Sequence, residues 1–484
     1  MSRRDTLAQV ELVEDDEPVP PERDPARRPR NRRWLLAVPV VAALLVGVQL
    51  VTDARDRAAD ARVAALPGAV DPLGEDLEVR WRADQAAAPS MFGPVRDQML
   101  HGPVTGPDGA QTYDAVDLRT GELAWSTPLT GPDGRLVEPR TSPTTTCGPW
   151  GDPGTDPERV VCLVTDGYQR HSAEGLDESA APTRSRLVVL DVTDGSVLAD
   201  HPGPLATSVA VLPGLAATAT LDDDQHLVVV ANDPLTGEEL WRYRGTDPAG
   251  GPMEANVTWT SGVGGMVVLS GLPGGPVMLS ASGERVETGP DVRSWGTTSQ
   301  GWFLTERPDP DGGAPVQRVY RPGAAPLEVL GRLLERRVDD GSVPGLEVST
   351  GARTYGWDGR TGDQLWDADV VATPGWHDSV LVLDGTVYLS ATGAVVALDA
   401  RTGETRWTAP RLEGAYWGDL LTDGPHLLLV EMPQDAVGTG FVTALDRRTG
   451  TFVRRMKVPA GFPAVVAVGR SLVATNGERV VSLG

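Results

Sequence analysis

A nine-residue phrase recurs along this chain, and it limits the possible folds more than any other feature. In its clearest form it reads Asp-Ala-Arg-Thr-Gly-Glu-Thr-Arg-Trp, with Gly four residues and Trp eight residues after the Asp. Four copies are complete and two lack the Trp; they begin at Asp117, Asp233, Asp358 and Asp399, and at Asp191 and Asp446. The chain is therefore expected to be a repeat protein.

Each copy of the phrase predicts a β-hairpin. The apolar runs before it are too short for helices and rich in β-branched residues, as in Leu187–Leu190, Leu227–Val230 and Val395–Leu398. The Asp can bond its own turn backbone, and the Gly can adopt the positive φ that a short hairpin loop requires. A second strand then begins, with the Trp on one face.

The spacing of the copies predicts a β-propeller. Successive copies start 74, 42, 125, 41 and 47 residues apart, and a period of roughly 40 to 45 residues with four short strands is typical of propeller blades. Degenerate units at Val277–Gly283 and Arg318–Gly323 fill the longest gap. The segment Leu327–Tyr355 is short of clear strands. We expect an all-β propeller of about eight four-stranded blades, with seven or nine as alternatives.

The ends of the repeat region suggest how such a ring would close. Arg479–Gly484 resembles the first strand of a hairpin without its partner, and Leu77–Arg82 resembles a second strand with nothing before it. Pairing the two would complete one blade from both ends and remove the open edges of the sheet array.

The tryptophans of the repeat are expected to pack between blades, because a blade cannot bury both faces alone and aromatic side chains are usually core residues. These residues are Trp81, Trp125, Trp241, Trp366 and Trp407.

The phrase at Asp399 resembles the repeat of pyrroloquinoline-quinone-type (PQQ-like) β-propellers. That family includes quinoprotein alcohol dehydrogenases and cofactor-free relatives, among them the propeller lipoprotein of the outer-membrane β-barrel assembly machine. The resemblance covers about residues 74–484 and implies the fold, whereas fold alone does not fix activity. The cofactor-free branch is the closer expectation, because the quinoprotein enzymes carry adjacent cysteines and this chain has none. No cofactor is expected.

Cys147 and Cys162 are the only cysteines, and both stand in segments that predict strands of one unit. Strands that neighbour each other would place the two thiols opposite one another. Because the domain is predicted to be exported, a disulfide is expected, with two buried thiols as the alternative.

Export is inferred from an apolar segment, Trp34–Val51, which is just long enough to cross a bilayer. A run of arginines precedes it, so the N-terminus is expected in the cytoplasm and the propeller outside the membrane. A cleaved signal peptide is the alternative. The predicted parts are a disordered cytoplasmic tail (1–33), a signal-anchor helix (34–51), a stalk that can prolong this helix up to Pro67 (52–73) and the propeller (74–484).

The net charge of −24 lies on the stalk and propeller, because the first 33 residues hold eight acids and eight arginines. Nucleic acid is therefore excluded as an expected partner of the propeller. Basic proteins, metal ions or cationic glycans fit better.

Catalytic signatures are missing from the sequence. The six histidines are scattered, and no phosphate loop, nucleophile elbow or zinc-binding spacing is present. Asp222–Asp224 and Asp309–Gly313 could hold calcium through carboxylates, but solvated turn acids are the preferred interpretation. No metal site and no catalytic residue are predicted.

A second set of tryptophans forms the one candidate binding surface. Trp376 and Trp417 each follow a repeat Trp by ten residues, near the next innermost strand, and Trp259 and Trp295 occupy related places. A ring of indoles at the channel mouth would suit a peptide or glycan, although packing under loops is the commoner role for such residues.

Three hypotheses of function follow from these observations. A membrane-anchored, extracytoplasmic, non-catalytic scaffold for an envelope protein or glycan is preferred. A quinone-dependent dehydrogenase and a single-pass sensor are the alternatives.

Overall fold

The computed structural model describes residues 32–484 apart from short internal segments. The segments that are not described are 86–87, 92, 139, 152–156, 172–174, 249–258, 273–274, 288–291, 293, 299, 310–311, 374–378, 411–418 and 433–439. The chain divides into two compact units, Met1–Ala59 and Asp60–Gly484. The second unit contains all the strands that the structure describes.

One helix, α1 (Arg32–Ala64), precedes the strands. It includes residues 52–64 of the predicted stalk (52–73) and ends just before Pro67 and Gly68, as expected from residues that cannot continue a helix. Residues 60–73, which the sequence suggests as part of a stalk, belong to the second compact unit. No helix within the described residues combines the length and apolarity needed to cross a lipid bilayer.

The strands form antiparallel units of four. In most units each strand pairs with the next strand along the chain. The first four complete units lie in the N-terminal half of the repeat region. Their strands are β2 (Val95–Arg96), β3 (Met99–Thr105), β4 (Gln111–Asp117) and β5 (Leu123–Pro128); β7 (Thr146–Trp150), β8 (Arg159–Thr165), β11 (Ser185–Asp191) and β12 (Val197–Pro202); β13 (Val209–Leu212), β14 (Leu215–Leu221), β15 (His226–Asn232) and β16 (Glu239–Pro248); and β17 (Trp259–Val263), β18 (Met266–Ser270), β19 (Val277–Ser280) and β20 (Arg285–Val286).

The next four units follow in the same way. Their strands are β21 (Ser294–Thr297), β22 (Phe303–Arg307), β23 (Val316–Tyr320) and β24 (Leu327–Leu330); β25 (Arg332–Asp339), β26 (Leu346–Thr350), β27 (Thr354–Asp358) and β28 (Gln364–Ala368); β29 (Ser379–Leu383), β30 (Thr386–Ala391), β31 (Ala394–Asp399) and β32 (Thr405–Pro410); and β33 (Leu420–Thr422), β34 (His426–Glu431), β35 (Phe441–Asp446) and β36 (Phe452–Lys457).

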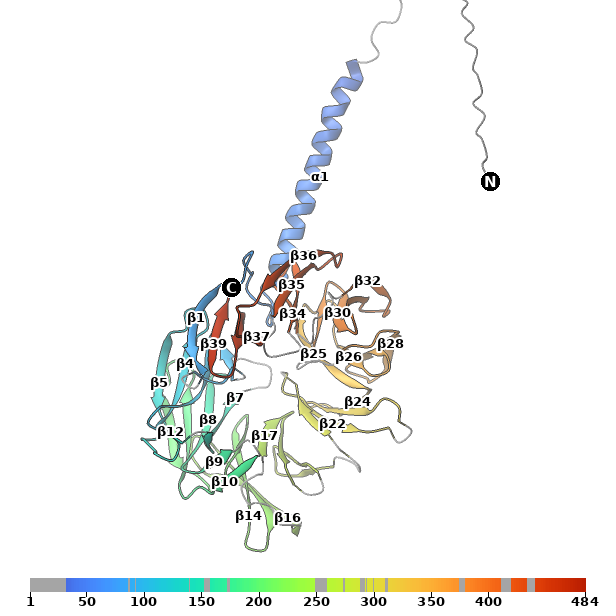
Figure 1. The fold of residues 1–484 in the computed structure, drawn as a ribbon. Coiled ribbons are helices and arrows are strands. Elements are labelled where there is room, and N and C mark those ends of the chain that lie inside the picture. The colour runs from blue at the N-terminus through green and yellow to red at the C-terminus, as the bar shows by residue number, and fades with distance from the viewer. Residues whose placement is uncertain are drawn as a thin grey trace, which may run out of the picture. The chain divides into compact units, whose positions relative to one another are not determined.

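The last unit is built from both ends of the repeat region. It contains β37 (Ala464–Val468), β38 (Ser471–Thr475), β39 (Arg479–Leu483) and β1 (Val79–Asp84), in the order β1-β39-β38-β37. β1 and β39 pair antiparallel, with Trp81 opposite Ser482. The predicted closing pair is thus confirmed, and Figure 1 shows β1 beside β39, with the other units arranged around a common centre within the second compact unit.

The described strands give nine such units, one more than the eight blades expected. Seven are separate sheets, and two form an eight-stranded sheet in which β25 pairs parallel with β29. The unit containing β25 carries the Asp358 copy of the phrase, and its inner strands β25 and β26 lie in the segment that lacked clear strands. This unit, which the sequence suggests is incomplete, is complete in the structure; Glu335, Arg336 and Arg337 interrupt the apolar pattern of β25.

A further small sheet is inserted into the unit that holds the two cysteines. It consists of β6 (Thr141–Pro143), β9 (Tyr168–His171) and β10 (Leu176–Ala180), in the order β10-β9-β6. The repeat pattern does not predict these three inserted strands.

The turn of the repeated phrase has the expected geometry in all six copies. At Asp399, for example, the carboxylate Oδ1 accepts a hydrogen bond from the backbone N–H of Arg401 at 2.9 Å. Gly403 has a φ of 74° and donates from its N–H to the Asp399 carbonyl at 2.8 Å. The pairing of β31 with β32 shifts register between Ala397 and Leu398. The combination is a hairpin with a bulge, which a left-handed Gly permits.

The hydrophobic core lies between neighbouring units and not within any one of them. One cluster, for example, joins Leu346 and Trp366 of one unit to Val396 and Leu398 of the next. Each unit therefore gains its stability from the units on either side.

Candidate functional site

The five repeat tryptophans lie against the turn glycine of the following unit. A Cβ placed on that glycine would come within 2.4 to 2.8 Å of the indole ring in every case. The pairs are Trp81 with Gly121, Trp125 with Gly195, Trp241 with Gly283, Trp366 with Gly403 and Trp407 with Gly450.

Three of these indoles also donate a hydrogen bond to the following unit. The Nε1–H groups of Trp81, Trp241 and Trp366 reach the carbonyl oxygens of Leu118 (2.7 Å), Ala281 (2.8 Å) and Ala400 (2.9 Å). Their apolar surface and their polar atom are both engaged inside the protein, so these tryptophans join units and do not form a ligand surface.

Two units without the repeat Trp fill the same place with other side chains. His201 lies on Gly237, and its Nε2 is 2.5 Å from the Leu235 carbonyl oxygen, whereas Leu327 lies on Gly362. The sequence prediction missed both. His201 could have been found from the sequence. It stands ten residues after Asp191, whereas the repeat Trp stands eight residues after its Asp, and positions two residues apart lie on the same face of a strand.

The proposed ring of channel-mouth tryptophans is only partly within the described residues. Trp259 begins β17 with 58% of its surface exposed. The backbone of Trp295 lies in β21, but its side chain is outside the described part, as are Trp376 and Trp417. The ring stays a prediction.

A large cavity lies among inner strands of the second compact unit. Its volume is about 1080 Å³, and its walls come from β25, β37, the turn between β2 and β3, the end of β21 and residues 65–68 after α1. No described residue of these walls is a tryptophan. Sequence reasoning did not identify this cavity, because its walls come from segments more than 200 residues apart.

Charged side chains of the cavity wall also fasten the segment after α1. Arg470 donates from Nε to Asp71 at 2.7 Å and from Nη2 to the carbonyl of Ala64 at 2.7 Å. A Cβ on Gly68 would lie 2.2 Å from the carbonyl oxygen of Arg337. The segment that enters the propeller is therefore part of the cavity wall.

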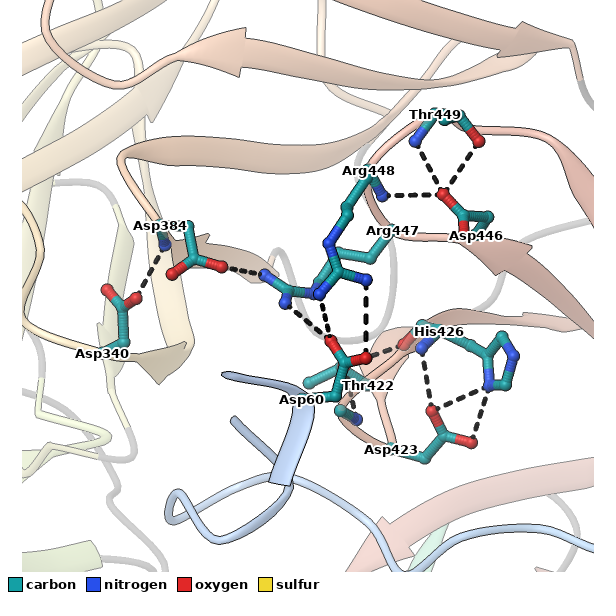
Figure 2. A network of polar contacts seen from close by, with 11 residues as sticks. Asp60, Asp340, Asp384, Thr422, Asp423, His426, Asp446, Arg447, Arg448 and Thr449 are labelled. Atoms are coloured by element: carbon teal, nitrogen blue, oxygen red, sulfur yellow. Dashed lines mark hydrogen bonds and ion pairs between the residues drawn. The ribbon is translucent and has the colours of Figure 1, made fainter. Parts of the chain in front are cut away.

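Arg447 is the centre of a polar network at the end of α1 (Figure 2). Its side chain is 1% exposed, and it pairs with Asp384 at 2.6 Å and with Asp60 at 3.2 Å. Arg448 also reaches Asp60, at 2.7 Å. Asp384 has a φ of 50° in the turn between β29 and β30, and its backbone N–H donates to Asp340 at 2.6 Å.

Opposite effects act on the pKa of Arg447. Burial lowers it, but hydrogen bonds from the guanidinium to Asp384 and Asp60 and the nearby Tyr388 outweigh burial, so the pKa is raised. The guanidinium is therefore a permanent cation that joins the end of α1 to two hairpin turns. Sequence reasoning missed this network because its members are scattered and lie in no recognisable motif.

The two cysteines form a disulfide, as predicted. Cys147 of β7 and Cys162 of β8 are directly opposite in the antiparallel pair. Cys162 is fully buried. The bond fixes two neighbouring strands of one unit.

The acidic run at Asp222 is used in local contacts. The Asp222 carboxylate accepts from the N–H of His226 at 2.9 Å and from Arg244 at 2.7 Å, and these contacts, led by the His226 bond, lower its pKa despite partial desolvation. Of the second run, residues 310–311 lie outside the described part. Among the described residues, no three His, Cys, Asp or Glu side chains come together to hold a metal ion.

Comparison with known proteins gives one family. The family model described as "Outer membrane protein assembly factor BamB" matches residues 338–437. BamB of Burkholderia pseudomallei (strain K96243) is 26% identical over 269 residues, which is 55% of this chain and 59% of that protein. The serine/threonine-protein kinase AfsK of Streptomyces griseus is 29% identical over 151 residues, 29% of this chain and 17% of the kinase. The chain thus matches less than two thirds of the length of either relative.

Solved structures give a weaker likeness. BamB from Moraxella catarrhalis has a TM-score of 0.38 and 14% identity, over 84% of this chain and 97% of that one. The quinohemoprotein alcohol dehydrogenase ADHIIG from Pseudomonas putida HK5 has a TM-score of 0.38 and 15% identity, over 89% and 81%. Likeness at these scores carries no argument about function. The family match, the BamB relative and the repeated hairpins together identify the chain as a PQQ-like β-propeller.

Proposed function

We propose that this chain is a membrane-tethered, extracytoplasmic β-propeller that acts as a non-catalytic scaffold for a protein of the cell envelope. The observation that carries the proposal is the similarity to BamB over 269 residues. That relative is named as an outer membrane protein assembly factor, and for this chain we infer a comparable role that is exercised by binding an envelope protein.

The proposed tether is the apolar segment 34–51 at the start of α1. Its described part carries large apolar side chains that are 52 to 66% exposed, namely Leu45, Val46, Val48, Leu50 and Val51. Exposed apolar residues in an unbroken helix favour a lipid environment. Arginines precede the segment, which favours a cytoplasmic N-terminus.

The tether can be tested by alkaline carbonate washing of membranes. Full-length chain is expected in the membrane pellet, and a variant lacking residues 34–51 is expected in the supernatant. Release of the full-length chain by the wash would rule out the tether, and protease accessibility in spheroplasts would give the side on which the propeller lies.

The scaffold function can be tested by photocrosslinking in intact cells. A photoreactive amino acid would replace Leu123, a 57% exposed residue on the outer strand β5, with the same cells kept in the dark as the matched control. One recurring envelope protein, captured from Leu123 on irradiation and not in the dark, is the expected product. Crosslinks only to lipid or glycan would contradict a protein scaffold.

A quinone-dependent dehydrogenase is the competing hypothesis. The two cysteine sulfur atoms of this chain are fifteen residues apart in sequence and bonded across β7 and β8, which differs from the adjacent cysteines implied for the quinoprotein enzymes. Titration of the full chain with pyrroloquinoline quinone and calcium is expected to leave its melting temperature unchanged. Saturable stabilisation would instead support the enzyme hypothesis.

A further inference from the structure

The turn between β38 and β39 contains the one Asn-Gly pair of the chain. Four asparagines occur in the 484 residues, and only Asn476 is followed by glycine. Asn476 and Gly477 are exposed, and Gly477 has a φ of 86°. A Cβ at Gly477 would meet no atom within 4 Å. Solvent therefore reaches this pair from the open side of the turn.

The chemistry of such a pair is intramolecular. The backbone nitrogen that follows an asparagine can attack the side-chain carbonyl carbon and close a succinimide ring, and glycine at that position has no side chain to hinder the approach. Asparagine is among the thermolabile residues of proteins. The rate of the reaction depends on the groups that surround the carbonyl carbon and the nitrogen.

Two backbone N–H groups hold the side-chain oxygen of Asn476. Oδ1 accepts from the N–H of Glu478 at 3.0 Å and from the N–H of Arg479 at 2.8 Å. Attack on Cγ converts this oxygen into an oxyanion. Fixed donors at roughly 2.7 to 3.1 Å from such an oxygen stabilise the tetrahedral intermediates of acyl transfer. The turn thus supplies a donor pair that favours the attack.

The attacking nitrogen is part of a chain of hydrogen bonds. The N–H of Gly477 donates to Oγ1 of Thr475 at 3.1 Å, and the Thr475 hydroxyl donates to Oε1 of Gln85 at 2.6 Å. Hydrogen bonds in a chain polarise one another, so this arrangement draws the Gly477 proton away from its nitrogen. The nitrogen becomes a nucleophile when that proton leaves.

Asn232 has a different setting and serves as the internal reference. The amide that follows it, the N–H of Asp233, donates to the backbone carbonyl of Glu238 at 2.9 Å within a hairpin turn. The Asn232 side chain donates from Nδ2 to the Gly237 carbonyl at 3.2 Å. The nitrogen next to Asn232 is therefore held by the hairpin and belongs to a residue with a side chain.

We propose that Asn476 is a site of spontaneous deamidation that this turn promotes, and that the isoaspartyl product loosens the closing unit. The Gly477 nitrogen loses its proton and bonds to Cγ, the bond from Cγ to Nδ2 breaks, and ammonia leaves. Water then opens the succinimide. Hydrolysis at Cγ restores an ordinary backbone and gives Asp, whereas hydrolysis at the backbone carbonyl carbon gives isoaspartate.

Isoaspartate adds a methylene group to the main chain inside a turn that fastens the end of β1. The N–H of Gln85 donates to the Glu478 carbonyl at 2.8 Å, and Arg479 is opposite Asp84 in the closing pair. A longer main chain displaces these groups. The Asp product keeps the turn, because a carboxylate oxygen accepts the same two N–H bonds.

The test follows deamidation in the full-length chain in detergent at mildly alkaline pH, by peptide mapping and mass spectrometry. Asn476 is expected to react at least about tenfold faster than Asn232, equivalent to about 1.4 kcal/mol in the barrier. The folded chain should react at Asn476 at least about threefold faster than the chain unfolded in guanidinium chloride. The free peptide Ala-Thr-Asn-Gly-Glu-Arg in both solvents corrects for the denaturant. Equal rates at the two asparagines, or a slower reaction in the folded chain, would overturn the proposal.

Substitution of Thr475 tests the chain of hydrogen bonds. Thr475→Val removes the acceptor of the Gly477 N–H and should slow deamidation at Asn476 by at least about twofold. Thr475→Ser keeps the hydroxyl and should retain the wild-type rate. Equal rates in the wild type and Thr475→Val, at equal melting temperatures, would show that the turn does not promote the reaction.

The effect on the closing unit is measured on aged protein. Aged wild type should melt below fresh wild type, and an isoaspartyl methyltransferase should label it at position 476. Aged Asn476→Gln, whose longer side chain closes a ring far less readily, is the control for other damage. Fresh Asn476→Asp, which carries the charge of the product on an ordinary backbone, should melt with fresh wild type. Aged wild type that is labelled but melts with aged Asn476→Gln would reject the loosening of the closing unit.

Discussion

The indole of Trp366 lies on Gly403, the turn glycine of the next unit, and leaves no room for a side chain there. A Cβ on Gly403 would approach the indole to 2.8 Å, and the indole Nε1–H donates to the neighbouring Ala400 carbonyl at 2.9 Å. Trp366 is 6% exposed and belongs to the cluster that joins two units. The same contact recurs at four other interfaces.

Trp366→Ala should therefore destabilise the propeller. The substitution removes a buried aromatic ring and a hydrogen bond between units, and we expect a loss of about 3 to 5 kcal/mol in the free energy of unfolding. Chemical denaturation followed by far-UV circular dichroism would measure it. Trp259→Ala, at a residue that is 58% exposed, is the control and should change stability little. Equal losses would contradict the interface role.

Loss of the disulfide should also lower stability. Cys147 and Cys162 are fifteen residues apart, and closing a loop of that size stabilises a protein by about 3 kcal/mol. Cys147→Ala/Cys162→Ala is expected to lower the free energy of unfolding by about that amount. Intact-mass analysis after alkylation should find no free thiol in the oxidised wild type. Two alkylated thiols without reductant would disprove the bond.

Glu347 should make stability depend on pH near neutrality. It is 3% exposed, and burial raises its pKa to about 7 although Arg336 is 3.0 Å away and Arg321 lies nearby; Asp339 raises the pKa slightly further. Its folded pKa lies above its ordinary value of 4.5. The stability that protonated Glu347 contributes is thus present below about pH 4.5 and lost as pH rises through about 7.

The wild type should accordingly lose stability relative to Glu347→Gln between pH 5 and pH 8, by at most roughly 3 kcal/mol. His101 acts in the opposite direction. Burial and Arg96 lower its pKa to about 4, so its contribution is lost as pH falls below about 6.5. Comparing wild type with Glu347→Gln at each pH cancels the His101 effect, and exposed Glu404→Gln serves as the control. A constant difference across the range would contradict the raised pKa of Glu347.

Replacement of Arg447 by methionine should weaken the attachment of the end of α1. Arg447→Met removes the buried cation that joins Asp384 to Asp60, but Asp60 keeps Arg448 at 2.7 Å and Asp384 is 57% exposed. The free energy of unfolding should therefore fall by less than the roughly 3 to 5 kcal/mol that is lost when a fully buried pair is broken. Hydrogen exchange should increase in residues 60–73 and in the turn after β35. Arg119→Met, which removes a cation that is 59% exposed, should leave exchange in both segments unchanged.

The sequence by itself determined the repeating hairpin, its Asp and Gly turn, the disulfide pairing and the closing strands. The first three features are local or nearly so: Asp399 bonds the backbone two residues later, Gly403 adopts a positive φ, and the cysteines stand on adjacent strands. The closing pair is not local, but each of its strands is recognisable as half of a repeat hairpin. Alternating apolar residues and turn residues carry that information directly.

Only the tertiary structure decided how many units form, and which side chains meet at the centre. Charged β25 becomes an inner strand because its far end pairs with β29, a contact between units that local pattern cannot show. Glu335, Asp97 and Arg470 come from segments far apart in sequence, yet they line one cavity. Asp60 and Arg447 meet in the same way. Closure of the chain on itself brings such residues together.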